Sequence, residues 1–333
     1  MTTSPELLDF ALRGDQQAFA DLVEPHRKEL IVHCYRMLGS LFEAEDAVQE
    51  AFLRAWQKLK TYEARASFRA WLYKIATNLC LDLLKKERRR GLPVDVYPAS
   101  NPDDPFAPPS DEFPWLEPFP DAWLEGLPPT PETRFQQTES ITLAFIAAIQ
   151  ALTPQQRASL ILKDVLEWTT REISELLEVS ETAANSLLFR ARKTMEQRYG
   201  NVGGEHISPS PDAPQVQHLL ERYVRAWETS NVDELVGLLR DDAILAMPPS
   251  PSWVRGAQAI RQALALNLIH ADMSDEWRLV PVRANGGPAY AFYHHENDGQ
   301  FVPFGIHLLT ITAGQISNIT HFFSPQLVAR FTA

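Results

Sequence analysis

Two proline- and glycine-rich segments constrain this chain most, because neither can continue a helix or a central strand. Residues 91–138 hold 12 of the 25 prolines, and proline removes a backbone donor and ends helices. A second break, GNVGGEHISPSPDAP, covers residues 200–214. At about 150 residues per domain, a chain of 333 residues should contain two or three domains. We expect folded units at 1–92, 139–200 and 215–333, joined by linkers at 93–138 and 201–214.

The first linker has more aromatic side chains than a pure spacer would have. Flexible and proline-rich spacers have little apolar surface to bury. Part of this linker should therefore pack on a domain surface. The aromatic residues are Phe106, Phe113, Trp115, Phe119 and Trp123.

Composition excludes several classes of protein. The chain has no run of about 18 to 20 apolar residues that could span a bilayer. Its start, MTTSPELLDFALRGD, has acids where a signal peptide would have a basic and then an apolar segment. We expect a soluble cytoplasmic protein with no membrane contact. Cys34 and Cys80 are too few and too far apart in sequence for a disulfide framework or a zinc cluster, so we expect reduced thiols, no metal and no cofactor.

The formal net charge of −12 is distributed unevenly. Residues 54–90 carry 11 basic and 3 acidic side chains, whereas residues 91–138 carry 1 and 9. Such an asymmetry indicates that one segment meets a polyanion and its neighbours do not.

Residues 68–86 predict a helix with one buried stripe and one cationic flank. The stripe contains Leu72, Ile75, Ala76, Leu79 and Leu83. The flank is either a solvated helix face beside a core tryptophan or a nucleic-acid face, since cations suit phosphates and aromatic rings suit exposed bases. The flank contains Trp71, Lys74, Asn78, Asp82, Lys85 and Arg89.

The helix expected at 42–56 begins with acids, as helix N-termini favour. It exposes Glu45, Asp46, Gln49 and Glu50. Acids this close to a basic helix would repel DNA, so this face should meet solvent or a protein partner.

The unit at 139–200 predicts a helix-turn-helix. A capping box at Thr169 to Glu172 starts a short helix to Leu177, and a turn at 178–180 leads into a longer helix at 181–197. The outer face of that helix has short polar groups first and cations later, as a recognition helix needs, although an ordinary amphipathic helix has a polar face too. The outer face contains Thr182, Ser186, Phe189, Arg190 and Lys193.

The unit at 215–333 predicts an α+β fold. Two helices and a strand come first, then a helix at 256–269, then strands near 276–284, 288–296, 301–313 and 315–323. We expect a curved antiparallel sheet.

Three segments in one order carry a family resemblance. HCYRMLGSLFEAEDAVQEAFLRAWQKL, FRAWLYKIATNLCLDLLKKERRR and the helix-turn-helix ending in LLFRARKTME resemble a bacterial extracytoplasmic-function (ECF) sigma factor. The resemblance implies that 1–92 is the σ2 domain, that 139–200 is the σ4 domain, and that the partners are core RNA polymerase, through its β′ clamp and β flap, and promoter DNA. Polymerase binding is then expected at Asp46, Gln49, Glu50 and Phe52.

The same resemblance assigns promoter contacts. The family holds a flipped base in the loop at 61–67. Where the family's turn usually has glycine this chain has Glu178, so we expect a less tight joint in the helix-turn-helix. The −10 element is expected at Arg65, Ser67, Trp71, Lys74, Asn78, Lys85, Arg88 and Arg89. The −35 element is expected at Arg171, Thr182, Asn185, Ser186, Arg190 and Lys193.

The C-terminal unit resembles a SnoaL-like cone of the polyketide-cyclase or ketosteroid-isomerase type. The expected fold class is thus multidomain, with all-α σ2 and σ4 domains and a C-terminal α+β cone barrel. ECF groups with such a domain also have a Trp-Leu-(x)-Pro motif between σ2 and σ4. Trp115, Leu116, Glu117 and Pro118 stand there. The resemblance implies an interdomain clamp through which the cone regulates the sigma domains in cis.

Pocket walls of such a cone are expected at Trp253, Tyr290, His307 and His321. Seven of the nine histidines follow residue 200, but the adjacent His294 and His295 would face opposite sides of the sheet, which argues against a metal site. We expect no catalysis. The alternatives are a DNA-binding protein with a ligand-binding or catalytic SnoaL-like domain, and a conventional dimeric repressor.

Overall fold

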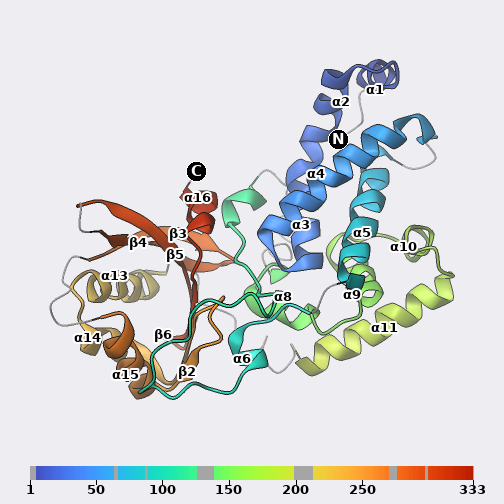
Figure 1. Ribbon diagram of the computed structural model, residues 1–333. Helices are drawn as coiled ribbons and strands as arrows, with labels where there is room; N and C mark the ends of the chain where they lie inside the picture. Colours follow the sequence, from blue (N-terminus) through green and yellow to red (C-terminus); the bar gives the residue numbers. More distant parts are fainter. Residues whose placement is uncertain are drawn as a thin grey trace. The chain divides into compact units, whose positions relative to one another are not determined.

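The computed structural model describes residues 5–63, 67–86, 89–125, 139–198, 213–269, 276–296 and 299–332. The chain forms two compact units (Figure 1). The first unit consists of Met1–Arg89, Trp123–Ile141 and Ala148–Gln197, and the second of Arg90–Ala122, Thr142–Ala147 and Arg198–Ala333.

The N-terminal part of the first unit is helical. Asp15 caps α2 by accepting hydrogen bonds from the backbone of Gln17 and Ala18, and Ser40 caps α4. Gly39, with φ of 74°, ends α3 in the left-handed conformation that glycine adopts readily. The helices are α1 (Pro5–Leu12), α2 (Gln16–Val23), α3 (Arg27–Leu38), α4 (Leu41–Lys58) and α5 (Phe68–Lys86).

The stripe predicted on α5 packs against α3 and α4. Leu72, Ala76 and Leu79 are buried. Cys34 and Cys80 are also fully buried, and both are reduced.

The helix-turn-helix forms within residues 139–198. The expected capping box of Thr169 with Glu172 is present, and Thr153 with Gln156 forms a second one. Glu178 adopts the left-handed conformation itself, with φ of 57° and ψ of 44°, and its N–H bonds back to Ser174. The expectation of a looser joint was therefore wrong: the tight turn forms without glycine. The helices are α8 (Leu143–Ile149), α9 (Pro154–Leu160), α10 (Thr170–Leu177) and α11 (Glu181–Arg198).

The second unit is an α+β domain with one six-stranded sheet, in the order β2-β1-β6-β5-β4-β3. The sheet is mixed, because β1 pairs with β6 in parallel while the other neighbours are antiparallel. The prediction of a purely antiparallel sheet was wrong at this pair, where α15 separates β1 from the meander and allows a parallel crossover. The elements are α13 (Pro214–Glu228), α14 (Val232–Gly237), β1 (Leu239–Ala246), β2 (Trp253–Arg255), α15 (Ala257–Asn267), β3 (Trp277–Ala284), β4 (Gly287–His295), β5 (Phe301–Thr312), β6 (Gln315–Phe322) and α16 (Pro325–Thr332).

Aromatic rings fill the interior between α13 and the sheet. Trp227 meets Phe292 edge to face, with ring centroids 5.0 Å apart, and Tyr223 stacks on Tyr290 at 5.8 Å. These ring contacts determine which face of α13 packs against the sheet.

Candidate functional site

A groove lies beside α4 in the first unit. It has a volume of about 500 Å³ and lies between α2 and α4, with Gln49 and Phe52 of the predicted polymerase-binding residues in its wall. Leu53 is 58% exposed at this groove. The sequence analysis missed Leu53, although its spacing of four residues from Gln49 and three from Glu50 puts it on the same helix face as both. The groove is lined by Gln16, Phe19, Ala20, Val23, Glu24, Arg27, Gln49, Phe52, Leu53 and Trp56.

The groove has an apolar floor and a charged rim. The rings of Phe19 and Trp56 are 5.1 Å apart, and the Arg27 guanidinium lies 5.0 Å from the centre of the Phe52 ring. Phe52 is itself only 8% exposed, so it forms floor and not rim. Asp46 and Glu50 are exposed.

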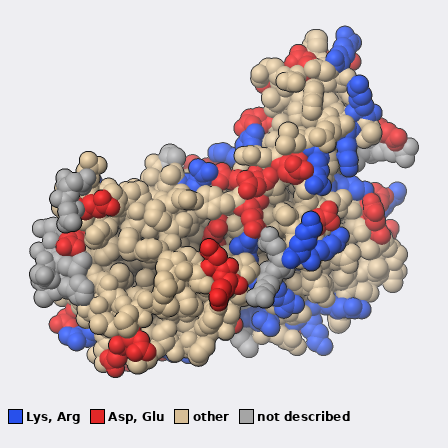
Figure 2. Space-filling model, viewed as in Figure 1, with Lys and Arg blue, Asp and Glu red and all other residues tan. Residues whose placement is uncertain are grey.

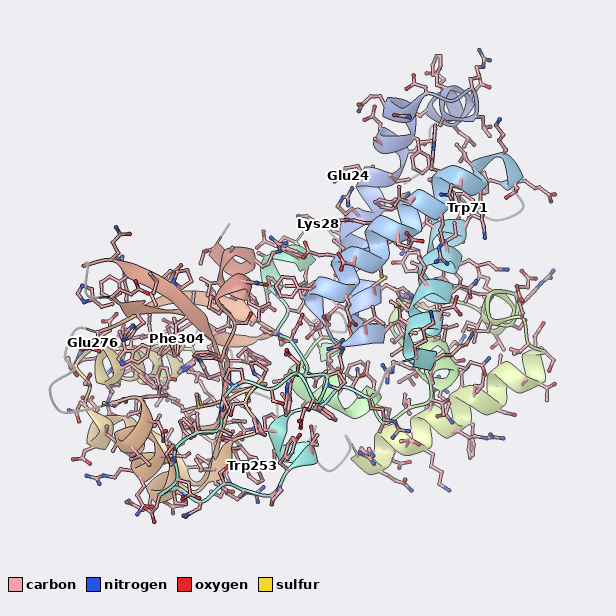
Figure 3. The ribbon with its side chains drawn as sticks, viewed as in Figure 1. Glu24, Lys28, Trp71, Trp253, Glu276 and Phe304 are labelled. Atoms are coloured by element: carbon pink, nitrogen blue, oxygen red, sulfur yellow. The ribbon has the colours of Figure 1, made fainter. Side chains whose placement is uncertain are left out.

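The cationic flank expected on residues 68–86 lies along α5, and we call it the α5 flank. It begins with an aromatic cluster. Trp71 lies 5.2 Å from Tyr62 and 5.5 Å from Phe68, measured between ring centroids. Trp71, labelled in Figure 3, is half-buried. Asn78 is half-buried as well, and no hydrogen bond of its side chain is found among the described residues. An aromatic ring and an unused amide on one helix face are groups that can contact unstacked bases.

The other −10 candidates that the structure describes lie near the two ends of α5. Ser67 accepts a hydrogen bond from the backbone of Ala70 at the start of α5. Lys85 forms an ion pair of 3.0 Å with Asp82, and Arg89 is exposed. Arg65 and Arg88 lie outside the described residues. On the face seen in Figure 2, lysine and arginine side chains gather over the helices of the first unit.

Lys74 already has partners within the first unit. Its ammonium group lies 3.7 Å from the carboxylate of Glu178 and 3.5 Å from the Glu175 carbonyl oxygen, at the end of α10. The ring of the adjacent Tyr73 lies 5.8 Å from that of Trp168. DNA binding through Lys74 therefore requires exchange of this contact.

A buried polar network holds α5 against α3. Arg69 and Glu29 form an ion pair of 2.7 Å, and Glu29 also bonds His26 at 2.6 Å. Burial alone would raise the pKa of Glu29, but hydrogen bonds from His26 and Arg69 lower it below its ordinary value. The network holds α5 in position, but none of its residues is part of the α5 flank. The sequence spacing did not predict this network.

The −35 candidates of α11 share one exposed face. Thr182, Asn185, Ser186, Arg190 and Lys193 are all exposed. Phe189 is 71% exposed beside them. Arg171 is exposed on α10, where Glu175 binds it at 3.0 Å. The structure thus brings five of the six candidates together and places the sixth on the preceding helix.

The linker at 90–122 packs within the second unit. Trp115 donates its indole N–H to the Ser110 carbonyl at 2.8 Å, and Arg90 donates to the Trp115 carbonyl at 2.9 Å. Leu116 is 1% exposed, and Phe119 is fully buried. The N–H of Phe119 bonds the Asn285 side chain at 2.8 Å, and the Asn285 N–H bonds the Phe119 carbonyl. The Trp115–Pro118 motif thus packs within the linker, and Phe119, which follows it directly, joins the linker to the β3–β4 turn.

The four predicted pocket residues divide into two groups. Trp253, labelled in Figure 3, donates its indole N–H to the Tyr97 carbonyl at 2.9 Å and so holds the linker. The ring centroids of His307 and His321 lie 4.3 Å apart in the interior, and the two residues are 2% and 1% exposed. His307 Nδ1 and the Tyr223 hydroxyl are hydrogen-bonded at 2.8 Å. Tyr290, opposite His307 in the β4–β5 register, stacks on Tyr223.

Burial keeps both interior histidines neutral. Desolvation lowers the pKa of His321 to about 3, and desolvation together with the nearby His321 lowers that of His307 well below 6.5. Within the described ranges no three His, Cys, Asp or Glu side chains are grouped to hold a metal ion. None of the described helices is long and apolar enough to cross a membrane.

Comparison with known proteins gives matches over all three regions. Residues 22–90 match the model for sigma-70 region 2, residues 142–195 that for sigma-70 region 4, and residues 220–319 that for the SnoaL-like domain. The ECF RNA polymerase sigma factor SigG of Mycobacterium tuberculosis (strain H37Rv) is 41% identical over 324 residues, which are 96% of this chain and 84% of that protein. SigJ of the same strain is 30% identical over 239 residues, 72% of this chain and 67% of SigJ.

One solved structure has the same fold over most of the chain. The crystal structure of M. tuberculosis SigJ aligns with a TM-score of 0.57 and 22% identity, covering 92% of this chain and 96% of that one.

Proposed function

Because the chain belongs to the ECF RNA polymerase sigma factors, which bind core RNA polymerase and direct transcription from specific promoters, we propose how its surfaces divide this work. The observation that carries the proposal is an apolar groove, an aromatic and cationic helix flank and a helix-turn-helix in one unit. The protein acts where bacterial core polymerase acts, in the cytoplasm.

The α4 groove receives a helix of the β′ clamp. An apolar floor with an exposed leucine and with charged residues in its lining is typical of a surface that takes an amphipathic helix. Asp46, Gln49 and Glu50 supply the polar rim, and Leu53 with Phe52 supplies the apolar contact. The β flap binds the unit at 139–200.

The α5 flank captures the melted −10 strand, and the exposed face of α11 reads the −35 element. Trp71 and Asn78 suit unstacked bases, whereas Lys85 and Arg89 suit phosphates. The ion pair between Lys74 and Glu178 supports weak DNA binding by the isolated protein, because this contact has to be replaced first.

The second unit regulates the first in cis and does not catalyse. Docking of the linker on the sheet supports regulation, because the linker connects the two DNA-binding parts in sequence. The burial of His307 and His321 supports a structural role, because neither imidazole is open to a substrate.

An in vitro transcription assay with purified core polymerase tests the proposal. The Leu53→Glu variant should lose at least tenfold in core binding and in initiation, because a buried carboxylate has no partner in an apolar contact. Leu266→Glu, at a leucine 44% exposed on α15, is the matched control and should bind core as the unaltered protein does. Unchanged binding by Leu53→Glu would remove the groove from the proposal.

A second pair of variants tests regulation through the linker. Trp115→Ala should change the level of transcription more than Phe106→Ala, because Trp115 is almost fully buried and hydrogen-bonded whereas Phe106 is half-buried. Equal behaviour of the two variants would contradict the clamp.

A further inference from the structure

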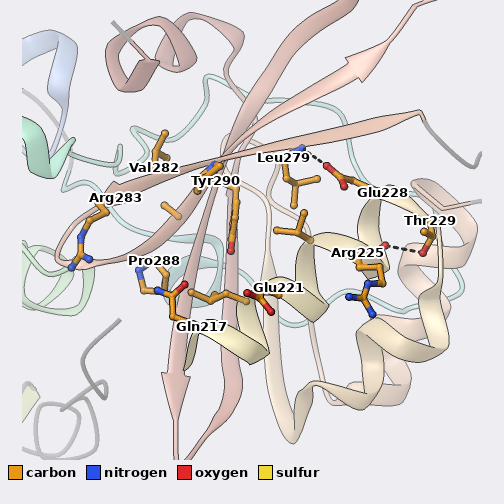
Figure 4. A pocket seen from close by; sticks show the side chains of 14 residues that line it. Gln217, Glu221, Arg225, Glu228, Thr229, Leu279, Val282, Arg283, Pro288 and Tyr290 are labelled. Atoms are coloured by element: carbon orange, nitrogen blue, oxygen red, sulfur yellow. Dashed lines mark hydrogen bonds between the residues drawn. The ribbon is translucent and has the colours of Figure 1, made fainter. Parts of the chain in front are cut away.

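A cavity of about 560 Å³ opens between α13 and the β3–β4 hairpin of the second unit (Figure 4). This volume lies within the range of small-molecule sites. His307 and His321 are not among its lining residues, so it is separate from the sealed interior. Its walls are mostly aliphatic: Leu220 and Val224 come from α13, Leu279 and Val282 from β3, and Pro288 and Ala289 from β4.

Tyr290 gives this cavity a polar group that points into it. The residue is 4% exposed, and its side chain extends from β4 toward Gln217 and Glu221 of α13. One face of its ring is covered by Tyr223. Its hydroxyl has no hydrogen bond in the part of the chain that the structure describes. The hydroxyl oxygen is not one of the fully enclosed polar atoms without a partner, so it faces the open cavity, where a ligand oxygen can take the place of water.

The hydroxyl can serve only as a donor or a neutral acceptor. Desolvation raises the pKa of Tyr290 to about 12, so the phenol keeps its proton at physiological pH. A ligand oxygen with lone pairs is the complementary group.

The charges around the cavity balance each other. Two glutamates, Glu221 and Glu228, and two arginines, Arg225 and Arg283, line it. Glu228 accepts a hydrogen bond from the Leu279 backbone at 3.4 Å, and Arg283 lies 3.8 Å from Asp121 of the linker. The lining residues thus include equal numbers of acids and cations, so they give a charged ligand no net attraction that would offset the loss of its hydration.

We propose that this cavity binds an uncharged, largely apolar molecule that offers a carbonyl or ether oxygen to the Tyr290 hydroxyl. The aliphatic walls cover the apolar body of the ligand, and the hydroxyl fixes its orientation.

Fluorescence titration of the full-length protein tests the proposal with prodan, an uncharged naphthyl ketone whose emission shifts to the blue in apolar sites. Prodan should bind saturably. Tyr290→Phe should weaken binding about 3- to 10-fold, the net value of one hydrogen bond. Val224→Trp should abolish binding, because Val224 is half-buried and the added ring fills the cavity. Naphthoate, of the same ring size but charged, should bind more weakly than prodan.

Tyr293→Phe is the matched control, since Tyr293 lies on the same strand but outside the cavity lining. It should bind prodan as the unaltered protein does. The isosteric Tyr290→Phe keeps the test valid should Val224→Trp fail to fold, which circular dichroism would reveal. The proposal is overturned by an absence of saturable binding, by equal affinity of Tyr290→Phe and Tyr293→Phe, or by tighter binding of naphthoate.

Discussion

At the scale of single residues, Glu178 shows that a tight turn can form at a residue type that disfavours the left-handed conformation. A non-glycine residue in the left-handed region costs about 1 to 2 kcal/mol. The turn forms nevertheless, because Ile173, Leu176 and Leu177 of α10 and Ala184 and Leu188 of α11 are buried on either side of it. Packing of the two helices outweighs the local strain.

Replacing Glu178 should therefore stabilise the protein. Glu178→Gly relieves the strain and should raise the free energy of unfolding of the first unit by up to about 1 kcal/mol, as measured by urea denaturation. Glu175→Gly, the same substitution inside α10, should lower it by about 1 kcal/mol. A loss of stability in Glu178→Gly as large as that in Glu175→Gly would show that the strain is not relieved.

His321 is a second residue that works against stability. Neither of its ring nitrogens has a hydrogen-bond partner in the part of the protein that the structure describes. His321→Leu should raise the free energy of unfolding of the second unit by about 1 kcal/mol at pH 7.5. Chemical denaturation followed by tryptophan fluorescence would measure this.

The buried histidines also set the pH dependence of the second unit. Their folded pKa values lie below 6.5, so the stability they allow is complete above pH 6.5 and is lost as the pH falls toward the folded pKa. Asp121 opposes this trend, because burial raises its pKa to about 6 and its contribution is present below pH 3.8 and lost as the pH rises through 6. Two histidines outweigh one aspartate, so the unit should be less stable at pH 5 than at pH 7.5. The slope should shrink in His321→Leu, because this variant removes one of the two buried imidazoles.

At the scale of elements, the sequence predicted the helices and strands whose positions follow from the spacing of apolar residues. The strand expected at 301–313 lies at Phe301–Thr312, and the helix expected at 181–197 is α11. Periodicity did not predict the parallel pairing of β1 with β6 or the contact of Trp253 with Tyr97, because both depend on which surfaces meet in three dimensions. For the same reason the aromatic residues of the linker indicated that it packs, but not that Asn285 is the partner of Phe119.

Asn285 connects the linker to the β3–β4 turn. It adopts φ of 52° and bonds Phe119 in both directions. Asn285→Ala removes the side-chain bond and adds strain, so it should lower stability by about 1 to 2 kcal/mol and speed proteolysis between residues 97 and 122. Asn285→Gly keeps the conformation and should show a smaller loss. Identical losses in both variants would assign the whole effect to the hydrogen bond.

At the scale of the whole molecule, two units with separate cores should unfold in separate steps. Two compact units of this kind need not follow one cooperative transition. Differential scanning calorimetry of the full chain should show two transitions, and the chain shortened to residues 1–200 should lack the one that belongs to the sheet. A single transition in the full chain would contradict this division.

The docked linker can form its contacts only after a much later part of the chain has been synthesised. Phe119 precedes its hydrogen-bond partner Asn285 by 166 residues. At about 5 to 20 residues per second, the ribosome needs roughly 10 to 30 seconds to synthesise that stretch. At the start of this interval the nascent chain contains α3, α4 and α5 but not yet the strands on which the linker docks. Any contact made through the docked linker therefore begins only near the end of translation.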